Sequence, residues 1–227
     1  MGAGAARPVG AVRSVLPSSG GAPGAEAVAE RALREPPRLG PVRLVCIDGP
    51  AGSGKTTTAE RVRADLVGRG AGVAVVHLDD LYDGWHGLEG TLWPRVSAQV
   101  LEPLRHGRAG RFQRYDWVAG RFAEWVDVPV EDVLLLEGCG AARRDADAVA
   151  SLRVWVEAPD ALRLERGLAR DGEAARAHWK AWMADERAHF AREGTRERAD
   201  LWLDAAGRVV AWTPDADNPT PSGTGLA

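Results

Sequence analysis

A glycine-rich turn between an apolar run and a helical pattern constrains the fold of this chain more than any other feature. Gly49–Thr56 reads Gly-Pro-Ala-Gly-Ser-Gly-Lys-Thr, which fits the pattern G-x-x-x-x-G-K-[ST] at every position. It follows the apolar run Val42–Asp48, which is typical of a buried parallel strand. It leads into Thr56–Val67, where apolar residues recur at helical spacing. This order of strand, turn and helix predicts a phosphate-binding loop.

The chemistry of such a loop assigns a role to each residue type in it. Glycines let successive backbone N–H groups turn inward around an anion, and the helix N-terminus adds partial positive charge. Lys55 can reach the β- and γ-phosphates, and the Thr56 hydroxyl can ligate Mg²⁺. We therefore expect ATP and Mg²⁺ as cofactors. The expected nucleotide contacts are Gly49, Ala51, Gly52, Ser53, Gly54, Lys55, Thr56 and Thr57.

The rest of the chain alternates between strand and helix patterns. Such alternation implies right-handed crossovers and a parallel sheet covered on both faces. We therefore expect an α/β fold of three layers, the phosphate-loop NTPase arrangement with a parallel sheet. Further strands are predicted at 73–78, 133–136 and 152–156, helices within 91–106, 161–169 and 173–192, and a last strand or hairpin at 201–203 and 209–212.

Composition sets the expected domain limits. Residues 1–40 are expected to form a flexible leader with one short helix at Glu26–Glu35, and residues 213–227 a disordered tail, because both ends are rich in Gly, Ala, Pro or Ser. Residues 41–212 form the predicted folded domain. The strongest apolar run, Val133–Leu136, ends at Glu137, so no segment approaches the roughly 20 residues that span a bilayer.

Charge and cysteine content exclude several classes of protein. A net charge of −3 argues against a protein that binds nucleic acid through phosphate contacts. The two cysteines, Cys46 and Cys139, make no disulfide framework, which favours a cytoplasmic location. Only Lys55 and Lys180 are lysines, so the guanine motif N/T-K-x-D is absent and GTPases are excluded. The expected partner is a small-molecule acceptor, with no nucleic acid and no membrane.

Carboxylates follow two of the predicted strands. Asp79 and Asp80 end the second strand, and Glu137 ends the third. Ligands of open α/β sheets bind at this edge. Asp79 can take a proton from an acceptor hydroxyl or face a metal ion, and Glu137 can hold an Mg²⁺-bound water. An acidic turn and a solvated strand-end glutamate are the alternative interpretations.

Together with the loop, Asp79-Asp80-Leu81-Tyr82 resembles the uridine kinase family of phosphate-loop kinases, whose wider relatives include phosphoribulokinase and bacterial pantothenate kinase. The resemblance implies that Asp79 is the catalytic base and that Asp80 and Tyr82 bind the acceptor. Leu81 replaces the family's usual Phe. Tyr115-Asp116-Trp117 is similar to the family's Tyr-Asp-Phe segment, which adds Tyr115 and Asp116 to the implied acceptor site.

The resemblance also implies a helical lid whose arginines close over the phosphates. Arg166 and Arg170 are the implied catalytic arginines and Arg176 an implied substrate contact, although 27 arginines make solvated helix faces an open alternative. A stripe on the same segment, Trp179, Trp182, Met183, Glu186 and Phe190, indicates core packing. Four other tryptophans could stack on a planar substrate: Trp85, Trp93, Trp117 and Trp125.

These patterns predict an ATP-dependent kinase that transfers the γ-phosphoryl group to a hydroxyl of a small molecule, with a nucleoside as the first candidate. A nucleoside-monophosphate kinase or another metabolite kinase shares the same core and remains an alternative. From a different class, a regulatory protein that binds ATP without transferring its phosphate fits the loop equally well.

Overall fold

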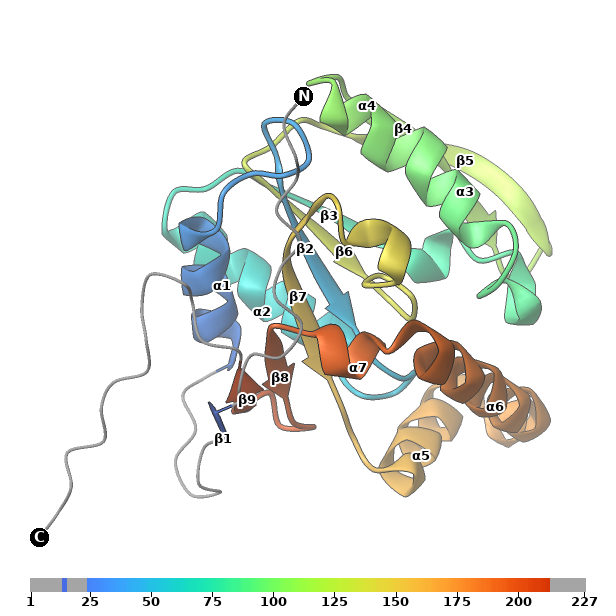
Figure 1. Ribbon diagram of the computed structural model, residues 1–227. Helices are drawn as coiled ribbons and strands as arrows, with labels where there is room; N and C mark the ends of the chain where they lie inside the picture. Colours follow the sequence, from blue (N-terminus) through green and yellow to red (C-terminus); the bar gives the residue numbers. More distant parts are fainter. Residues whose placement is uncertain (1–13, 16–23, 213–227) are drawn as a thin grey trace, which may run out of the picture.

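The computed structural model describes residues 14–15 and 24–212 and contains a seven-stranded sheet in the order β1-β9-β8-β7-β2-β6-β3 (Figure 1). The five strands from β8 to β3 run parallel, and β9 and β1 extend the sheet antiparallel. This confirms the predicted α/β class with a mostly parallel sheet. The strands are β1 (Ser14–Val15), β2 (Arg43–Asp48), β3 (Val73–His77), β6 (Val133–Glu137), β7 (Ala150–Val156), β8 (Leu201–Leu203) and β9 (Val209–Trp212).

Alternation along the central strand divides the core into two layers. Leu44 and Cys46 of β2 belong to the apolar cluster under α3 and α4, whereas Val45 and Ile47 belong to the cluster under α1 and α2. Helices therefore cover both faces, and the predicted three layers are confirmed (Figure 1). The covering helices are α1 (Gly24–Arg34), α2 (Lys55–Gly68), α3 (Leu92–Val96), a π-helical turn (Ser97–Leu101) and α4 (Glu102–Arg105).

Helix α1 corrects the expected start of the folded domain. Val28, Ala29 and Ala32 of this helix are fully buried in the cluster beneath α2. Leu39 is fully buried on the other side of the sheet. The boundary expected at residue 41 is therefore wrong, because residues 24–40 contribute side chains to both cores. The expectations for residues 1–13, 16–23 and 213–227 fall outside the described residues.

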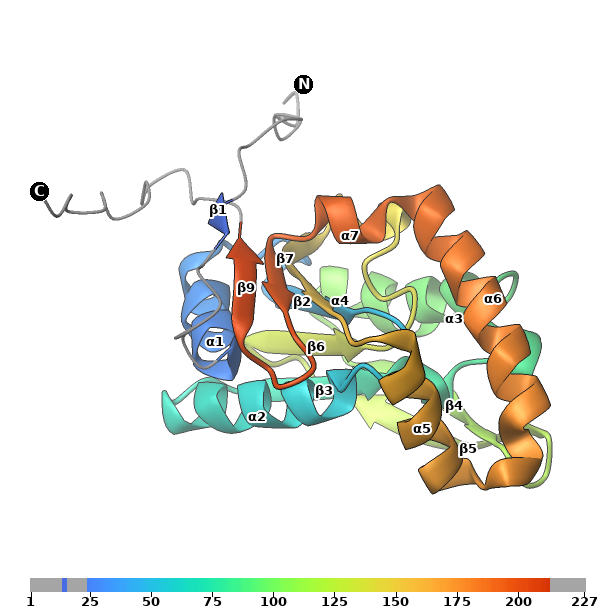
Figure 2. The same ribbon diagram turned by 90° about the horizontal axis from the view of Figure 1, so that it is seen from below.

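The two longer of the remaining helices lie beyond the carboxyl ends of the parallel strands, and the last, short helix packs against β7. Helices α5 (Asp160–Asp171), α6 (Arg176–Glu193) and α7 (Thr195–Arg198) follow β7, and Figure 2 shows α5 and α6 at the end of the sheet toward which the β6 arrow points. An antiparallel hairpin, β4 (Gly110–Asp116) and β5 (Arg121–Val128), stands apart from the main sheet. Short 3-10 turns occupy Leu78–Asp80, Gly84–His86, Arg144–Ala146 and Glu173–Ala175.

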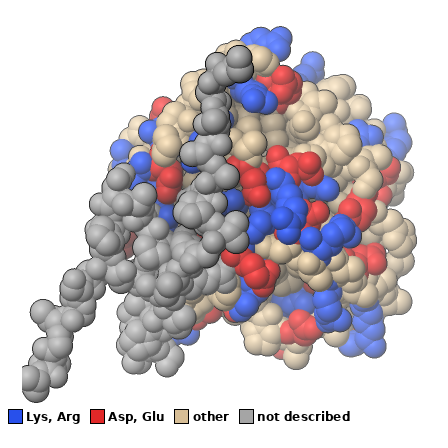
Figure 3. All heavy atoms as spheres, in the orientation of Figure 1, with Lys and Arg blue, Asp and Glu red and all other residues tan. Residues whose placement is uncertain are grey.

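The surface carries charges of both signs. On the face shown in Figure 3, arginine and carboxylate side chains are interspersed. Among the described residues, none of the helices combines the length and apolar character needed to cross a bilayer.

Candidate active site

The glycine-rich loop between β2 and α2 needs its glycines for close packing. Gly49, Gly52 and Gly54 all have positive φ, at 146°, 76° and 105°. A Cβ on Gly49 would lie 2.1 Å from the carbonyl oxygen of Val156, and one on Gly52 would lie 2.7 Å from that of Arg163. The loop is therefore pressed against β7 and α5, and only glycine fits at these two positions.

A buried carboxylate holds the start of the loop. Asp48 is fully buried and accepts the backbone N–H groups of Gly49, Gly140 and Ala142 at 2.7, 2.9 and 2.8 Å. Burial raises the pKa of Asp48, while the three backbone donors pull it back down. Asp48 is not among the residues predicted for the site. The sequence does show it as the one acidic residue of the apolar run, directly before Gly49. Asp48 ties the phosphate loop to the loop after β6.

Lys55 lies in the wall of the site. Its side chain is largely buried, and Nζ donates to the carbonyl of Pro50 at 3.1 Å and lies 3.7 Å from Cys139 Sγ. Burial alone would lower the pKa of Lys55, but Cys139 and the carboxylates of Glu137 and Asp79 hold it above its usual value. Lys55 therefore keeps its positive charge at neutral pH and can bind phosphate oxygens.

Thr56 and Glu137, which with Asp79 are the expected metal ligands, face each other. Thr56 Oγ1 lies 3.3 and 3.4 Å from the two Glu137 oxygens. Glu137 also binds His77 Nδ1 at 2.8 Å, and this hydrogen bond raises the pKa of His77. In the described part of the chain, no three His, Cys, Asp or Glu side chains form a ready metal site. This all-oxygen pair fits Mg²⁺, which usually takes one or two carboxylates and completes its shell with phosphates and water.

Asp79 lies across the same cavity from the loop. The protein around the Asp79 carboxyl, together with the negative charge of Glu137, raises its pKa, and Lys55 and Arg170 oppose that rise. Its backbone carbonyl accepts the indole N–H of Trp117 at 3.0 Å, which ties the β4–β5 hairpin to the end of β3. Asp79 is thus a carboxylate with raised basicity, placed between the loop lysine and the hairpin.

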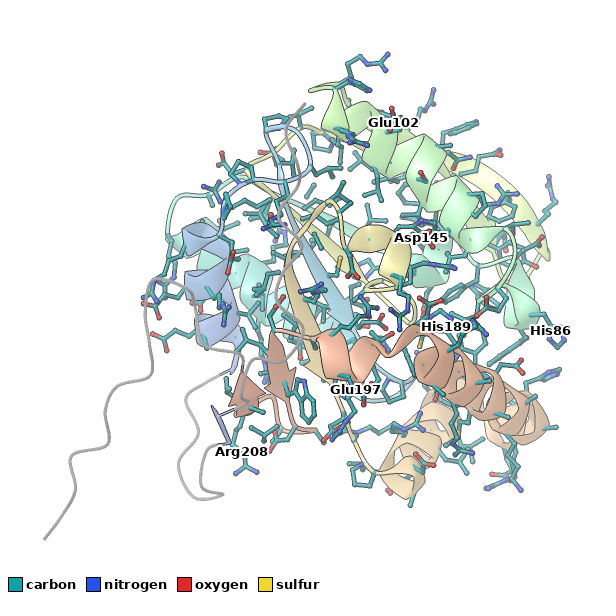
Figure 4. The ribbon with its side chains drawn as sticks, in the orientation of Figure 1. His86, Glu102, Asp145, His189, Glu197 and Arg208 are labelled. Atoms are coloured by element: carbon teal, nitrogen blue, oxygen red, sulfur yellow. The ribbon has the colours of Figure 1, made fainter. Side chains whose placement is uncertain are left out.

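One cavity of about 990 Å³ joins these groups. We call its two parts the nucleotide end and the acceptor end. The nucleotide end is lined by the phosphate loop with Thr57, Thr58, Arg61, Arg166 and residues 204–207, and the acceptor end by Asp79, Asp80, Tyr82, Trp85, Trp117, Cys139, Arg170, Asp171, Trp179 and Trp182. Arg166 connects the loop to the 204–207 turn, since it donates to the carbonyls of Gly52 at 3.2 Å and Ala205 at 3.4 Å. Arg208, labelled in Figure 4, follows this turn.

Several residues predicted for the site lie elsewhere. Arg176 is exposed, pairs with Glu173 and does not line the cavity. Asp116 accepts the N–H groups of Val118 and Ala119 at 2.9 Å, so it stabilises the hairpin turn. Tyr115 packs edge-on against two aromatic rings of the hairpin and is not in the cavity wall. Gly49, Trp93 and Trp125 also lie outside that wall.

Tyr82 lines the cavity with little exposed surface. It is 2% exposed, and its hydroxyl donates to the carbonyl of Cys139 at 2.8 Å. Its hydroxyl therefore ties the segment after the 3-10 turn Leu78–Asp80 to the loop after β6, while its ring meets Trp182 edge-on at a centroid distance of 5.0 Å. Tyr82 was expected to bind the acceptor; it lines the cavity, and its hydroxyl is already occupied within the protein.

Glu186 and Arg163 form a buried ion pair. The sequence pattern assigned Glu186 to a core-packing stripe and did not indicate this pair. Glu186, 1% exposed, accepts from Arg163 at 2.5 Å and from the backbone N–H of Ala51 at 2.7 Å. Arg163 donates in turn to the Ala51 carbonyl at 2.9 Å. The signal was a carboxylate within an otherwise apolar helix stripe. The pair clamps α5 and α6 onto the phosphate loop from both sides of one residue.

His189 also connects α6 to the rest of the site. Its ring, labelled in Figure 4, is fully buried, and Nδ1 lies 2.6 Å from Oε1 of Glu89. Gly140 donates its N–H to Asp48 and also lies close to this ring. A Cβ added at Gly140 would lie 3.4 Å from His189 Nε2. Helix α6 is therefore fixed at both Glu186 and His189.

Comparisons with solved structures identify the fold. A possible uridine kinase from Bacillus stearothermophilus matches with a TM-score of 0.60 and 20% identity, over 79% of this chain and 97% of that chain. A protein described as a fructose transport system kinase from Silicibacter sp. TM1040 matches with a TM-score of 0.57 and 25% identity, over 79% and 98% of the two chains. No family model and no curated protein matches the sequence. The chain therefore has the fold of the uridine kinase-like phosphate-loop kinases, as the resemblance of its motifs predicted.

Proposed function

We propose that this protein is an ATP-dependent kinase that transfers the γ-phosphoryl group to a hydroxyl of a small molecule, a nucleoside in the first place. One observation carries the proposal. A single cavity joins the phosphate loop with Lys55 to the carboxylate of Asp79, and aromatic side chains continue the wall beyond it. Donor and acceptor can therefore meet in one enclosed space.

The nucleotide end supplies the contacts for ATP. Backbone N–H groups of residues 52–56 and the Lys55 ammonium would hold the phosphates, and the turn 204–207 beside Arg166 would hold the base. Thr56 and Glu137 would hold Mg²⁺. Bound there, Mg²⁺ neutralises charge on the phosphate oxygens.

The proposed chemical step depends on Asp79. Its raised pKa makes it a stronger base than an ordinary aspartate. It would accept the proton of the attacking hydroxyl. Arg170, whose charge acts on Asp79, would favour the ionised form of that carboxylate, and Lys55 would balance the negative charge of the transferring group.

The wall of the acceptor end supports a nucleoside as the acceptor. Trp85 and Trp117 present large aromatic surfaces, which suit stacking on a flat base. The similar structure described as a possible uridine kinase points the same way, whereas the one described as a fructose transport system kinase makes a sugar the second candidate. We also propose a cytoplasmic location, in line with the two free, buried thiols.

The test replaces Asp79 by Asn and measures ADP formation with a panel of nucleosides, sugars and other alcohols. We expect Asp79→Asn to lose acceptor-stimulated turnover by about 10²–10⁴-fold and to keep its affinity for ATP. Asp83→Asn is the matched control, since Asp83 is exposed and outside the cavity wall, and it should retain turnover. Full turnover by Asp79→Asn would contradict the proposed base. Tight ATP binding with no stimulation by any acceptor would favour the regulatory class.

A further inference from the structure

The acceptor end combines aromatic surfaces with one unused hydrogen-bond donor. Trp85 meets Trp117 and Trp182 edge-on, with ring centroids 5.8 and 6.3 Å apart. Trp182 lines the cavity and is only 5% exposed, and its Nε1–H has no hydrogen-bond partner within the described residues. The Nε1 atom is itself covered by the protein, so the ring surfaces are what this end offers to a ligand. These aromatic surfaces suit a flat molecule.

Positive charge is distributed unevenly along the cavity. Lys55 belongs to the phosphate loop, Arg166 reaches Gly52 and Ala205, and Arg61 lies beside Gly207, so these three serve the nucleotide end. Among the lining residues that the structure describes, this leaves Arg170 as the cation of the acceptor end.

Arg170 is already engaged by its neighbour in the chain. Its Nε and NH2 donate to the two oxygens of Asp171 at 2.7 and 3.0 Å. Asp171 also accepts the indole N–H of Trp179 at 2.9 Å, which fixes the carboxylate in the wall. The guanidinium fork is thus turned toward a carboxylate of the protein. A carboxylate or phosphate on an acceptor would have to compete for it.

The other charges at this end are negative. Asp79 and Asp80 line the wall with Asp171, and Arg114, which lies 3.3 Å from Asp80, is not a lining residue. An anionic acceptor would therefore enter beside three carboxylates, with one cation that is already paired. Like charges placed together in a binding site oppose the wrong partner more than they assist the right one.

We propose that the acceptor end selects alcohols that carry no negative charge, and that Asp171 is a specificity-determining residue because it occupies Arg170. This inference rests on the proposed function and narrows it. It favours a free nucleoside or a neutral sugar over phosphorylated or carboxylated acceptors.

The experiment compares matched acceptors that share the same free hydroxyl. A nucleoside and its 3′-monophosphate both retain the 5′-hydroxyl, and glycerol and glycerate form a second pair. For the wild type, we expect kcat/KM to favour the neutral member by at least about tenfold. Asp171→Asn removes one negative charge and releases Arg170, so it should reduce this ratio about tenfold. Because the ratio is taken within one variant, it does not depend on the amount of active protein.

Two further variants make the result specific. Glu173→Gln is the matched control, since Glu173 holds Arg176 in a similar side-chain pair outside the cavity, and it should leave the ratio unchanged. Arg170→Gln removes the cation and leaves Asp171 negative, so it should increase the preference for the neutral acceptor. If Asp171→Asn does not fold, Arg170→Gln still tests the charge selection, because an unchanged or smaller preference for the neutral acceptor would contradict it.

The outcomes separate this inference from the function on which it rests. If no acceptor of either charge stimulates ADP formation, the proposed function fails and the inference falls with it. If the wild type uses anionic acceptors as well as neutral ones, the inference is overturned and the kinase assignment stands. An unchanged ratio in Asp171→Asn, with a strong neutral preference in the wild type, would remove Asp171 from the role given to it.

Discussion

Two aspartates in one cavity are tuned in opposite directions by the groups beside them. The surrounding protein and the charge of Glu137 raise the pKa of Asp79. The hydrogen bonds from Arg170, and that from Trp179, lower the pKa of Asp171. A carboxylate with raised pKa suits proton transfer, and one with lowered pKa stays charged. The two side chains are therefore assigned different tasks by their surroundings.

This contrast can be measured by carboxyl NMR titration of the Mg²⁺-free protein. We expect the pKa of Asp79 above the ordinary value of 3.8 and that of Asp171 below it. Arg170→Gln should raise the pKa of both, because Arg170 stabilises the ionised form of each. Arg176→Gln should move neither. A pKa of Asp79 at or below that of Asp171 would contradict the assignment of Asp79 as the base.

The loop residues could be predicted because their chemistry depends on neighbours in the chain. Lys55 and Thr56 follow from the motif alone, and both line the cavity. The arginines could not be separated in this way. Arg170 and Arg176 each form an ion pair with an acidic residue close in the chain, so the sequence does not distinguish them. The path of the chain between α5 and α6 places Arg170 in the cavity wall and Arg176 outside it.

At the scale of elements, one buried ion pair connects helices α5 and α6 to the phosphate loop. Arg163 of α5 and Glu186 of α6 hold the N–H and carbonyl of Ala51 between them. Their side chains are 4% and 1% exposed, so neither charge can find water if its partner is lost. Any closing movement of these helices over a nucleotide must therefore occur beyond this clamp, toward Arg170.

The clamp predicts a large stability effect from one residue. Glu186→Ala removes the buried carboxylate that binds Arg163 and the Ala51 N–H, and leaves Arg163 with Asp160 as its other carboxylate partner, so we expect it to lower the free energy of unfolding by about 3 kcal/mol. Asp185→Ala, an exposed neighbour on the same helix, should change it by no more than about 0.5 kcal/mol. Urea unfolding followed by tryptophan fluorescence measures both. Equal, small effects would show that the clamp contributes little.

The elements differ in how clearly the sequence indicates them. The strands β2, β3, β6 and β7 are apolar runs buried by helices, and their pattern is local. Six of the fifteen strand residues of the β4–β5 hairpin are charged, and the hairpin lies outside the main sheet, so no apolar run in the sequence indicates it. Helix α1 lies in a region where the Gly, Ala and Pro content around it indicates a leader, yet its apolar face packs against α2 and β7.

At the scale of the whole molecule, the cavity is made by segments that are far apart in the chain. Its wall is formed by the phosphate loop, the end of β3, Trp117 of the hairpin, α5 and α6, and the turn after β8. Each segment alone is a loop end or a helix face, and only the packing of the sheet brings them together. This is why motif residues such as Lys55 and Asp79 could be placed at the cavity from the sequence, whereas Trp179 and residues 204–207 could not.

Transfer of a phosphoryl group from ATP to a hydroxyl in this cavity can be followed with a label. The protein is incubated with ATP labelled at the γ-phosphate and with the acceptor that best stimulates ADP formation. We expect the label to appear in a phosphate ester of that acceptor, one for each ADP formed, and we expect Lys55→Ala to abolish the transfer. Label found only in free phosphate, or transfer that persists in Lys55→Ala, would contradict the proposed kinase activity.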